Sequence, residues 1–405
     1  MKRICVISKS DTRGGGASVV AEQLANEYRA MGLEVAHYHL DSEKLHPYGR
    51  RRGVVHYSKT LAGRVGYRDH FPFELLSSRV RGLPSEFDYL HLHDMSTVLS
   101  AATIKWLARR MPTIWTLHDL SPFTAGCIYP SGCEAYKTTC HNCPALGSWP
   151  LSTRFDRTPV LHEARKALRN EPVFFSAPSM WMLGKFTEAG GSTKQVRFVS
   201  NCVETDVFQP TDQAVLREKF GLGDVKGPVI AFSAGWLADS RKGPFEVAQT
   251  LWRLKHLHPK LVLMGRWSDD AAHLFKGLDV THLGFIKGEA ERAEFFAMAD
   301  ATLLYSKEEN APLTAIESLS VGTPVFGFAA GGIPEIVVSG QTGYVSEQFS
   351  VNEVADQIEV MRPWSNLIVR SQCRQRAEAI YKYRGVAQQF IKYFEDLAAS
   401  KLEDK

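Results

Sequence analysis

Residues 306–338, SKEENAPLTAIESLSVGTPVFGFAAGGIPEIVV, decide the fold of this chain. The apolar run before them, residues 301–305, predicts a buried strand. Residues 313–321 have helical apolar spacing, and Gly322 ends that helix. Residues 324–328 then predict a second buried strand, which runs into a glycine-rich turn. Strands that alternate with helices over such short links are typical of an α/β protein with a parallel sheet.

This stretch also predicts a binding site. Glu309 and Glu317 stand on either side of the link from the first strand into the helix. Pro312 suits the start of that helix, where a missing N–H costs nothing. The free N–H groups of the first turn form an anion site, and the turn at residues 329–332 lies at the same sheet edge. Together the two turns predict a crevice for a phosphorylated ligand.

The chain has 405 residues and a net charge of +4. That length predicts two domains, and so small a charge indicates no particular class of partner. No apolar run is long enough to span a bilayer, and the apolar run at the N-terminus is too short for a signal peptide. We therefore expect a cytoplasmic protein, in which free thiols or a metal site are more common than structural disulfides.

We expect three segments. Residues 1–210 form a first doubly wound domain, residues 211–384 a second one, and residues 385–405 a helix that returns to the first domain. The linker is predicted between about 210 and 226, where glycines and charged residues accumulate. In the first strand-to-helix turn, Gly15 and Gly16 would let the backbone approach a ligand, although a merely flexible turn is an equal alternative.

Residues 44–82 are basic and contain interleaved aromatic residues, with only Asp69 and Glu74 as acidic residues. The plain interpretation is a solvated face. The functional interpretation is a surface for an anionic partner, such as a lipid phosphate or the inner face of a membrane, which would make the protein peripheral there. Nucleic acid is disfavoured because the overall charge is small and no nucleic-acid module is present.

Two predicted strands, residues 87–93 and 113–117, each end in a His-Asp pair. The pairs are His93-Asp94 and His118-Asp119. A lone histidine is usually structural, but two such pairs at the carboxyl ends of parallel strands favour a site, with His118 as the candidate.

Four of the seven cysteines lie in the loop at residues 126–147. They are Cys127, Cys133, Cys140 and Cys143. Four thiolates can enclose one tetrahedral zinc ion, although the spacing of the first pair is looser than usual. A redox-active Cys-x-x-Cys and a set of unbridged thiols are the alternatives. We predict a structural zinc.

In the second domain, Arg241 and Lys242 directly precede a predicted helix at residues 245–254. Two cations at a helix N-terminus oppose its dipole, at a cost of a few tenths of a kcal/mol or more. The cost is offset if the cations and the helix face the same anion.

In this order the motifs resemble the retaining glycosyltransferases of family 4 (glycosyl transferases group 1). Those enzymes have the GT-B fold, with two Rossmann-like domains facing a central cleft. The resemblance rests on residues 117–119, 241–243, 309–317 and 331–335 and covers nearly the whole chain. The cysteine loop resembles that of enzymes which build cell-surface polysaccharides of the colanic-acid type.

The resemblance implies a nucleotide diphosphate sugar as donor and a saccharide or polyprenyl-diphosphate-linked acceptor. It implies that Arg241 and Lys242 neutralise the diphosphate without a catalytic metal, and that His118 lies near the reacting carbon. Glu309 would bind the sugar and Glu317 the ribose. The remaining donor-binding residues it implies are Gly15, Gly16, Asn201, Phe285, Ile286, Pro312, Leu313 and Thr314.

The chain departs from this family's pattern at Trp236, where arginine is common, and at Asn310, where glycine is common. We expect Arg241 to supply the missing cation. The alternatives are a nucleotide-sugar epimerase or a phosphorylase on the same fold, and a binding protein with a degenerate site. A dinucleotide oxidoreductase is disfavoured because residues 14–16 do not continue into G-x-G-x-x-G.

Overall fold

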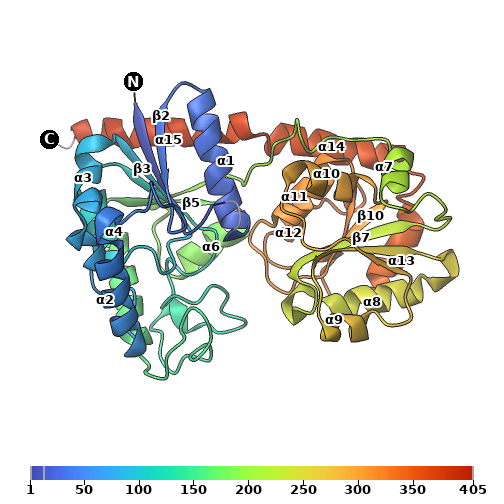
Figure 1. Cartoon of the computed structure of the whole chain (residues 1–405), viewed down its shortest axis with the longest axis horizontal. Helices are drawn as coiled ribbons and strands as arrows, with labels where there is room; N and C mark the ends of the chain where they lie inside the picture. The colour runs from blue at the N-terminus through green and yellow to red at the C-terminus, as the bar shows by residue number, and fades with distance from the viewer. Residues whose placement is uncertain (1, 12–13, 404–405) are drawn as a thin grey trace. The chain divides into compact units, whose positions relative to one another are not determined.

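The computed structural model describes residues 2–11 and 14–403, and Figure 1 shows its elements. The chain divides into two compact units, Met1–Ser200 with Arg384–Lys405, and Asn201–Tyr383. The predicted domain ends at residues 1, 404 and 405 lie outside the described residues. Each unit holds one parallel six-stranded sheet, so the predicted α/β class is confirmed.

The first unit has the strand order β2-β1-β3-β4-β5-β6. The direction of winding reverses between β1 and β3, which makes this the switch point where open α/β sheets bind ligands. The central strands β3, β4 and β5 are buried on both faces, as a parallel sheet covered by helices requires. The strands are β1 (Arg3–Ile7), β2 (Glu34–Tyr38), β3 (Tyr89–His93), β4 (Thr113–Thr116), β5 (Val173–Ala177) and β6 (Val196–Phe198).

Helices cover this first sheet, and the last helix of the chain is one of them. In α15 (Tyr383–Glu403), the side chains of Phe390, Tyr393, Phe394 and Leu397 are buried. The Tyr393 hydroxyl donates to the backbone oxygen of Phe175 at 3.2 Å, so the predicted return of the C-terminal helix to this unit is present. The others are α1 (Gly16–Ala30), α2 (Arg52–Arg64), α3 (Ser78–Glu86), α4 (Ala101–Ala108), α5 (Thr158–Lys166) and α6 (Met180–Glu188).

The second unit has the strand order β12-β11-β10-β7-β8-β9, with its switch point between β7 and β10. At this point β10 pairs with β7 in parallel, with Ala301 opposite Ile230 and Leu303 opposite Phe232. The strands are β7 (Val229–Trp236), β8 (Lys260–Arg266), β9 (Val280–His282), β10 (Ala301–Leu304), β11 (Val325–Phe328) and β12 (Gly343–Ser346).

The helices of the second unit connect these strands or cover them (Figure 1). The two strand-to-helix turns of residues 306–338 lead into α11 and α12. The helices are α7 (Gln213–Lys219), α8 (Pro244–Arg253), α9 (Asp269–Leu274), α10 (Glu289–Ala297), α11 (Leu313–Ser320), α12 (Ile333–Ile336), α13 (Val351–Met361) and α14 (Leu367–Ile380).

The division between the units lies earlier than the linker expected at about 210–226. That segment contains α7, which belongs to the second unit. Arg217 pairs with Asp300 at 2.8 Å, and the Gln213 amide donates to the backbone oxygen of Ala299 at 2.8 Å. The glycines that suggested a linker are therefore turns next to a short, anchored helix.

None of the helices within the described part of the chain is long and apolar enough to cross a membrane.

Candidate active site

In the second unit, the loops that follow β7 and β10 meet at the switch point. After β7 the backbone forms a short 3-10 turn, Ser240–Lys242, which Asp239 caps by accepting the Arg241 N–H at 3.0 Å. The Lys242 ammonium group pairs with the carboxylate of Glu309, which follows β10. Glu309 is buried and about a third of the Lys242 side chain is exposed, so the cation lies at the surface of the site.

The glycine-rich turn after β11 closes around the Glu309 loop. The backbone oxygen of Glu309 accepts the Gly332 N–H at 2.9 Å. Gly331 has a φ of +61°, and a Cβ atom there would lie 1.8 Å from the Glu309 oxygen, so only glycine fits. The two turns predicted to share one sheet edge are thus hydrogen-bonded to each other.

Glu317 lies inside α11, which begins at Leu313 with Pro312 directly before it. Arg292 of α10 donates two hydrogen bonds to Oε1 of Glu317, at 3.2 and 3.0 Å. Burial raises the pKa of Glu317, and the Arg292 charge opposes that rise. Arg292 was not predicted, and its signal was modest: it is the one basic residue in the acidic sequence of α10.

A second arginine that no sequence pattern predicts is Arg266, at the end of β8. Its guanidinium group lies over the ring of Trp236, 5.2 Å from the centroid, and over that of Phe285, 5.5 Å away. Arg241, which we expected to supply the missing cation, is largely exposed and pairs with Asp239 at 2.7 Å. Arg266, on the neighbouring strand β8, therefore places a cation beside Trp236, where the chain departs from the family pattern.

The other predicted donor residues of the second unit surround these groups. Phe285 is half-exposed in the loop after β9, and Ile286 packs partly against the core. The Asn201 amide donates to the backbone oxygen of Ala311 at 2.8 Å, next to the start of α11. Leu313 and Thr314 are the first two residues of that helix.

In the first unit, the predicted residues gather at the carboxyl ends of β1, β3 and β4. Gly15, with a φ of +97°, precedes α1, and Gly16 begins it. Asp94 follows β3 with a φ of 43°, a strained value for a residue with a side chain. Burial raises the pKa of Asp94 to about 7, the Asp119 charge adds to the rise and Lys9 opposes it.

His118 is partly buried at the end of β4. Its Nε2 shares a hydrogen bond of 2.8 Å with Nδ1 of His93. Burial lowers the pKa of His118 to about 3 and lowers that of His93 well below its ordinary value, so both rings are neutral at pH 7. His118 therefore offers a hydrogen-bonding group and not a positive charge.

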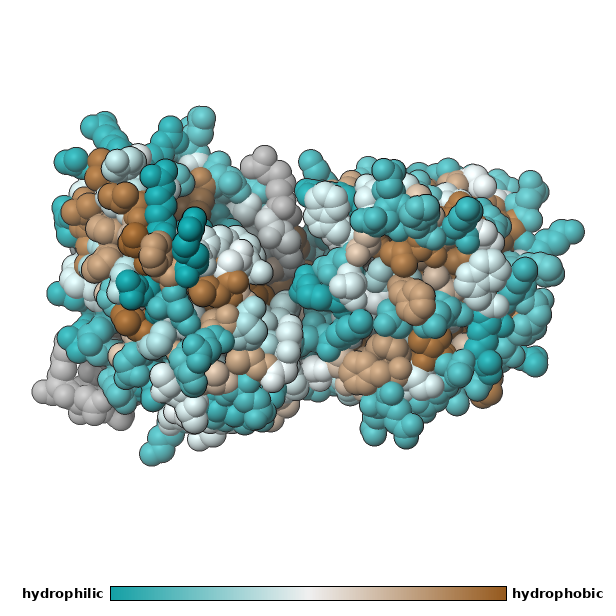
Figure 2. Space-filling view, turned by 90° about the horizontal axis from the view of Figure 1, so that it is seen from below, coloured by the Kyte–Doolittle hydropathy of each residue, from teal (hydrophilic) through white to brown (hydrophobic). Residues whose placement is uncertain are grey.

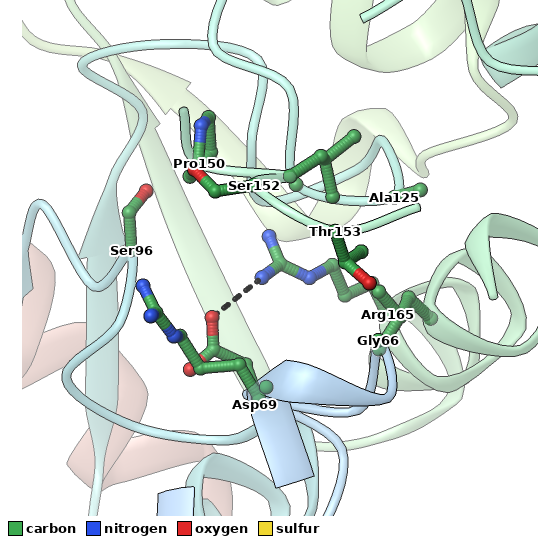
Figure 3. Close-up of a pocket in the computed structure, with 13 residues that line it drawn as sticks. Gly66, Asp69, Ser96, Ala125, Pro150, Ser152, Thr153 and Arg165 are labelled. Atoms are coloured by element: carbon green, nitrogen blue, oxygen red, sulfur yellow. Dashed lines mark ion pairs between the residues drawn. The ribbon is translucent and has the colours of Figure 1, made fainter. Parts of the chain in front are cut away.

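A polar pocket opens beside this edge of the first unit (Figure 3). Asp69 faces Arg165 across it, with Oδ2 and Nη2 3.9 Å apart, and Lys59 also pairs with Asp69 at 3.3 Å. Ser96, Ser152 and Thr153 add hydroxyl groups. The remaining lining residues are Gly63, Gly66, Arg68, Ala125, Gly126, Pro150, Leu151 and Leu161.

The four predicted zinc ligands line a second cavity in the first unit. Cys140 is buried, and Cys127, Cys133 and Cys143 are partly buried. Burial raises the pKa of Cys127 to about 12 and that of Cys140 to about 11. Within residues 2–11 and 14–403, no three His, Cys, Asp or Glu side chains have the arrangement of a metal site, so the zinc remains a prediction.

Family models match both units of the chain. Residues 217–377 match the family described as Glycosyl transferases group 1, and residues 14–207 match Glycosyltransferase Family 4. Together these ranges take in most of the chain, which therefore belongs to these glycosyltransferases.

Individual proteins agree with this family. WcaC of Escherichia coli (strain K12) is described as a colanic acid biosynthesis glycosyl transferase. It is 24% identical to this chain over 70% of this chain and 68% of its own length. Four other relatives, among them the N-acetyl-alpha-D-glucosaminyl L-malate synthase of Bacillus anthracis, match over 35% to 54% of their own length, and two D-inositol 3-phosphate glycosyltransferases match over 74% and 88% of theirs.

Solved structures share the fold. The sucrose-phosphate synthase of Thermosynechococcus elongatus has a TM-score of 0.74 at 18% identity, over 99% of this chain and 100% of that chain. Alr3699/HepE of Anabaena, solved in complex with UDP-glucose, has a TM-score of 0.69 at 16% identity, over 98% of this chain and 100% of that chain. The predicted GT-B fold is thus confirmed.

Proposed function

We propose that this chain is a retaining glycosyltransferase that moves a sugar from a nucleotide diphosphate sugar to a saccharide or a lipid-linked saccharide. The observation that carries the proposal is the Lys242–Glu309 pair at the switch point of the second sheet, where doubly wound folds bind nucleotides. The start of α11 and the buried Glu317–Arg292 pair belong to the same unit.

Each group has a task in that reaction. The diphosphate leaves with negative charge, and a fixed cation such as Lys242 stabilises that charge most in the transition state. Glu309 accepts hydrogen bonds from sugar hydroxyls, and Glu317 from the ribose. Protein cations take the place of a catalytic metal. Retention rests on the resemblance to family 4 enzymes, in which the acceptor attacks from the face that the diphosphate leaves.

The acceptor would bind in the first unit. The pocket around Asp69 and Arg165 offers carboxylate, guanidinium and hydroxyl groups, which suit a saccharide or its phosphate (Figure 3). His118 and Asp94 offer neutral or weakly charged hydrogen-bonding groups at the ends of β4 and β3. The likeness to WcaC supports a role in surface-polysaccharide synthesis.

Purified protein, incubated with a panel of nucleoside diphosphate sugars, tests the proposal. We expect one donor to raise the thermal midpoint, because a bound ligand stabilises the folded state by mass action. With an acceptor, the product analysed by NMR should keep the donor's anomeric configuration. Conversion of the donor to another nucleotide sugar without acceptor would indicate an epimerase instead. No stabilisation by any donor would contradict the proposed function.

The α2 helix supports a membrane location for the acceptor. Four apolar side chains, those of Val54, Tyr57 and Leu61 in this helix and of Val65 directly after it, are between 46% and 71% exposed. Arg50, Arg51 and Arg52 precede them. Figure 2, which views the molecule from below, shows hydrophobic surface among hydrophilic side chains on the first unit. An apolar stripe with basic residues beside it suits peripheral binding to an anionic membrane.

Vesicle co-sedimentation tests this location. Binding should require anionic lipid and should weaken about 100-fold when Arg50, Arg51 and Arg52 are all changed to glutamine, at about 1 kcal/mol per basic residue near the surface. Replacing three exposed lysines of the second unit, Lys226, Lys255 and Lys276, gives a control with the same loss of charge. Equal binding of both variants and the wild type would contradict the membrane surface.

A further inference from the structure

We propose that Cys127, Cys133, Cys140 and Cys143 bind one zinc ion, which holds the loop that forms a wall of the polar pocket in the first unit. The four cysteines line a single cavity together with Tyr136, His141 and the backbone of the same loop. Four thiolates around one ion is the usual composition of a closed, structural zinc site. The assignment goes beyond glycosyl transfer, since no step of that reaction uses these thiols.

The loop between β4 and α5 needs such a cross-link. Over some forty residues between Thr116 and Thr158, its described structure contains no strand and only one short helical turn, Ala135–Lys137. Loops of that length without secondary structure are uncommon in compact domains, because their backbone has few internal partners. Yet Phe123, Tyr136 and Leu151 of this loop are buried in the core of the first unit. A bound metal explains how an irregular segment keeps one conformation.

The Cys140–Cys143 turn is also held from outside. Asn142 adopts a φ of 47°, which bends the chain between the two cysteines. The Asp156 carboxylate accepts the N–H groups of Asn142 and Cys143, and Nδ1 of His162 accepts the Cys140 N–H at 3.1 Å. Such partners orient the ligands of a metal without touching it.

The charge balance fits as well. Four thiolates and one zinc ion carry two negative charges, and the thiols release their protons to solvent on binding. The buried guanidinium of Arg165 interacts electrostatically with Cys127 and Cys140. Arg165 also faces Asp69 in the polar pocket, and Ala125 lines both cavities. The metal would therefore fix one wall of the pocket that we assign to the acceptor.

The test is metal analysis of the full chain, purified without a chelator or a metal-binding tag. We expect about one zinc per chain, and a thiolate-to-cobalt absorption band after cobalt exchange. Cys133→Ser and Cys140→Ser should each lose most of the zinc. Cys373→Ser, which removes a buried thiol of the second unit, is the matched control and should keep it.

Wild-type protein provides the decisive result even if the variants fail to fold. A wild type without zinc whose seven thiols are all titratable after denaturation would overturn the proposal. A disulfide found by mass spectrometry between any two of the four cysteines would do the same, in favour of a redox pair. Glycosyl transfer is measured separately, so failure of the metal site leaves the proposed function intact.

Discussion

The carboxyl edges of the two sheets are built from opposite kinds of side chain. The second sheet presents charges in pairs, Lys242 with Glu309 and Arg292 with Glu317. At the ends of its strands the first sheet presents groups whose charge is suppressed by burial, and its charged pair, Asp69 with Arg165, lies in the pocket beside them. There the pKa of Asp94 is raised to about 7 and that of His118 is lowered to about 3.

The difference indicates a division of tasks. An anionic ligand needs fixed cations, and their carboxylate partners keep them oriented until it binds. A hydroxyl-rich ligand needs hydrogen-bond donors and acceptors, and a neutral group costs less to bury than a charged one. The second sheet thus suits the diphosphate, and the first suits saccharide hydroxyls.

Among the variants that test this difference between the two sheets, removal of the Lys242 side chain should have the largest effect on activity. We expect Lys242→Ala to lower kcat/KM about 100-fold, because the leaving diphosphate loses the cation that we assign to it, which corresponds to about 2.7 kcal/mol of barrier. Steady-state kinetics with the best donor measures this. Lys219→Ala, which removes a surface ion pair with Glu294, is the control and should keep full activity. A Lys242→Ala variant that is folded and fully active would contradict the assignment of diphosphate binding to the second sheet.

Arg241 and Arg266 are the two candidates for the cation that replaces the family arginine missing at Trp236. Their variants show which of them binds the diphosphate. We expect Arg241→Ala and Arg266→Ala each to lower kcat/KM about tenfold, or about 1.4 kcal/mol. Full activity of Arg241→Ala would show that Arg241 does not replace the family arginine. A loss in Arg266→Ala alone would then assign that charge to β8, where Trp236 and Phe285 hold the guanidinium group.

Glu317 tests whether the buried pair binds donor or only stabilises the helices. We expect Glu317→Gln to raise the donor KM about fivefold with little change in kcat, as loss of uniform binding does. The change also leaves Arg292 unpaired, so the thermal midpoint should fall. The double variant Glu317→Gln, Arg292→Met should regain stability but not affinity. If KM recovers with stability, Glu317 has a structural role only.

The sequence predicts the parts of this molecule that depend on local pattern. Apolar periodicity predicts the strands around residues 301–328, and the glycine pattern predicts the tight turn at Gly331, where no Cβ atom fits. It predicts neither Arg266 nor Arg292, because each acts through residues far away in the chain. The unit boundary is predicted too late for the same reason, since the contacts that anchor α7, such as Arg217 with Asp300 and Gln213 with Ala299, join residues far apart in the chain.

The suppressed charge of Asp94 gives the first sheet its own test, which measures stability and not activity. Between its ordinary pKa of 3.8 and the raised value of about 7, the folded chain binds more protons than the unfolded chain. The free energy of unfolding therefore falls as pH rises through this window and levels off above it.

Asp94→Asn removes this titration, so its stability relative to the wild type should increase from pH 5 to pH 8. Over that range the gain is at most about 3 kcal/mol, because each of the two pH units from pH 5 to the raised pKa of about 7 corresponds to about 1.4 kcal/mol, and the midpoint should rise by several degrees. Thermal unfolding across that range measures it, with the exposed Asp224→Asn as control. A constant difference between Asp94→Asn and the wild type would mean that Asp94 is ionised throughout. The carboxyl edge of the first sheet would then carry a fixed charge, as that of the second sheet does. The proposed division of tasks between the two sheets would no longer hold.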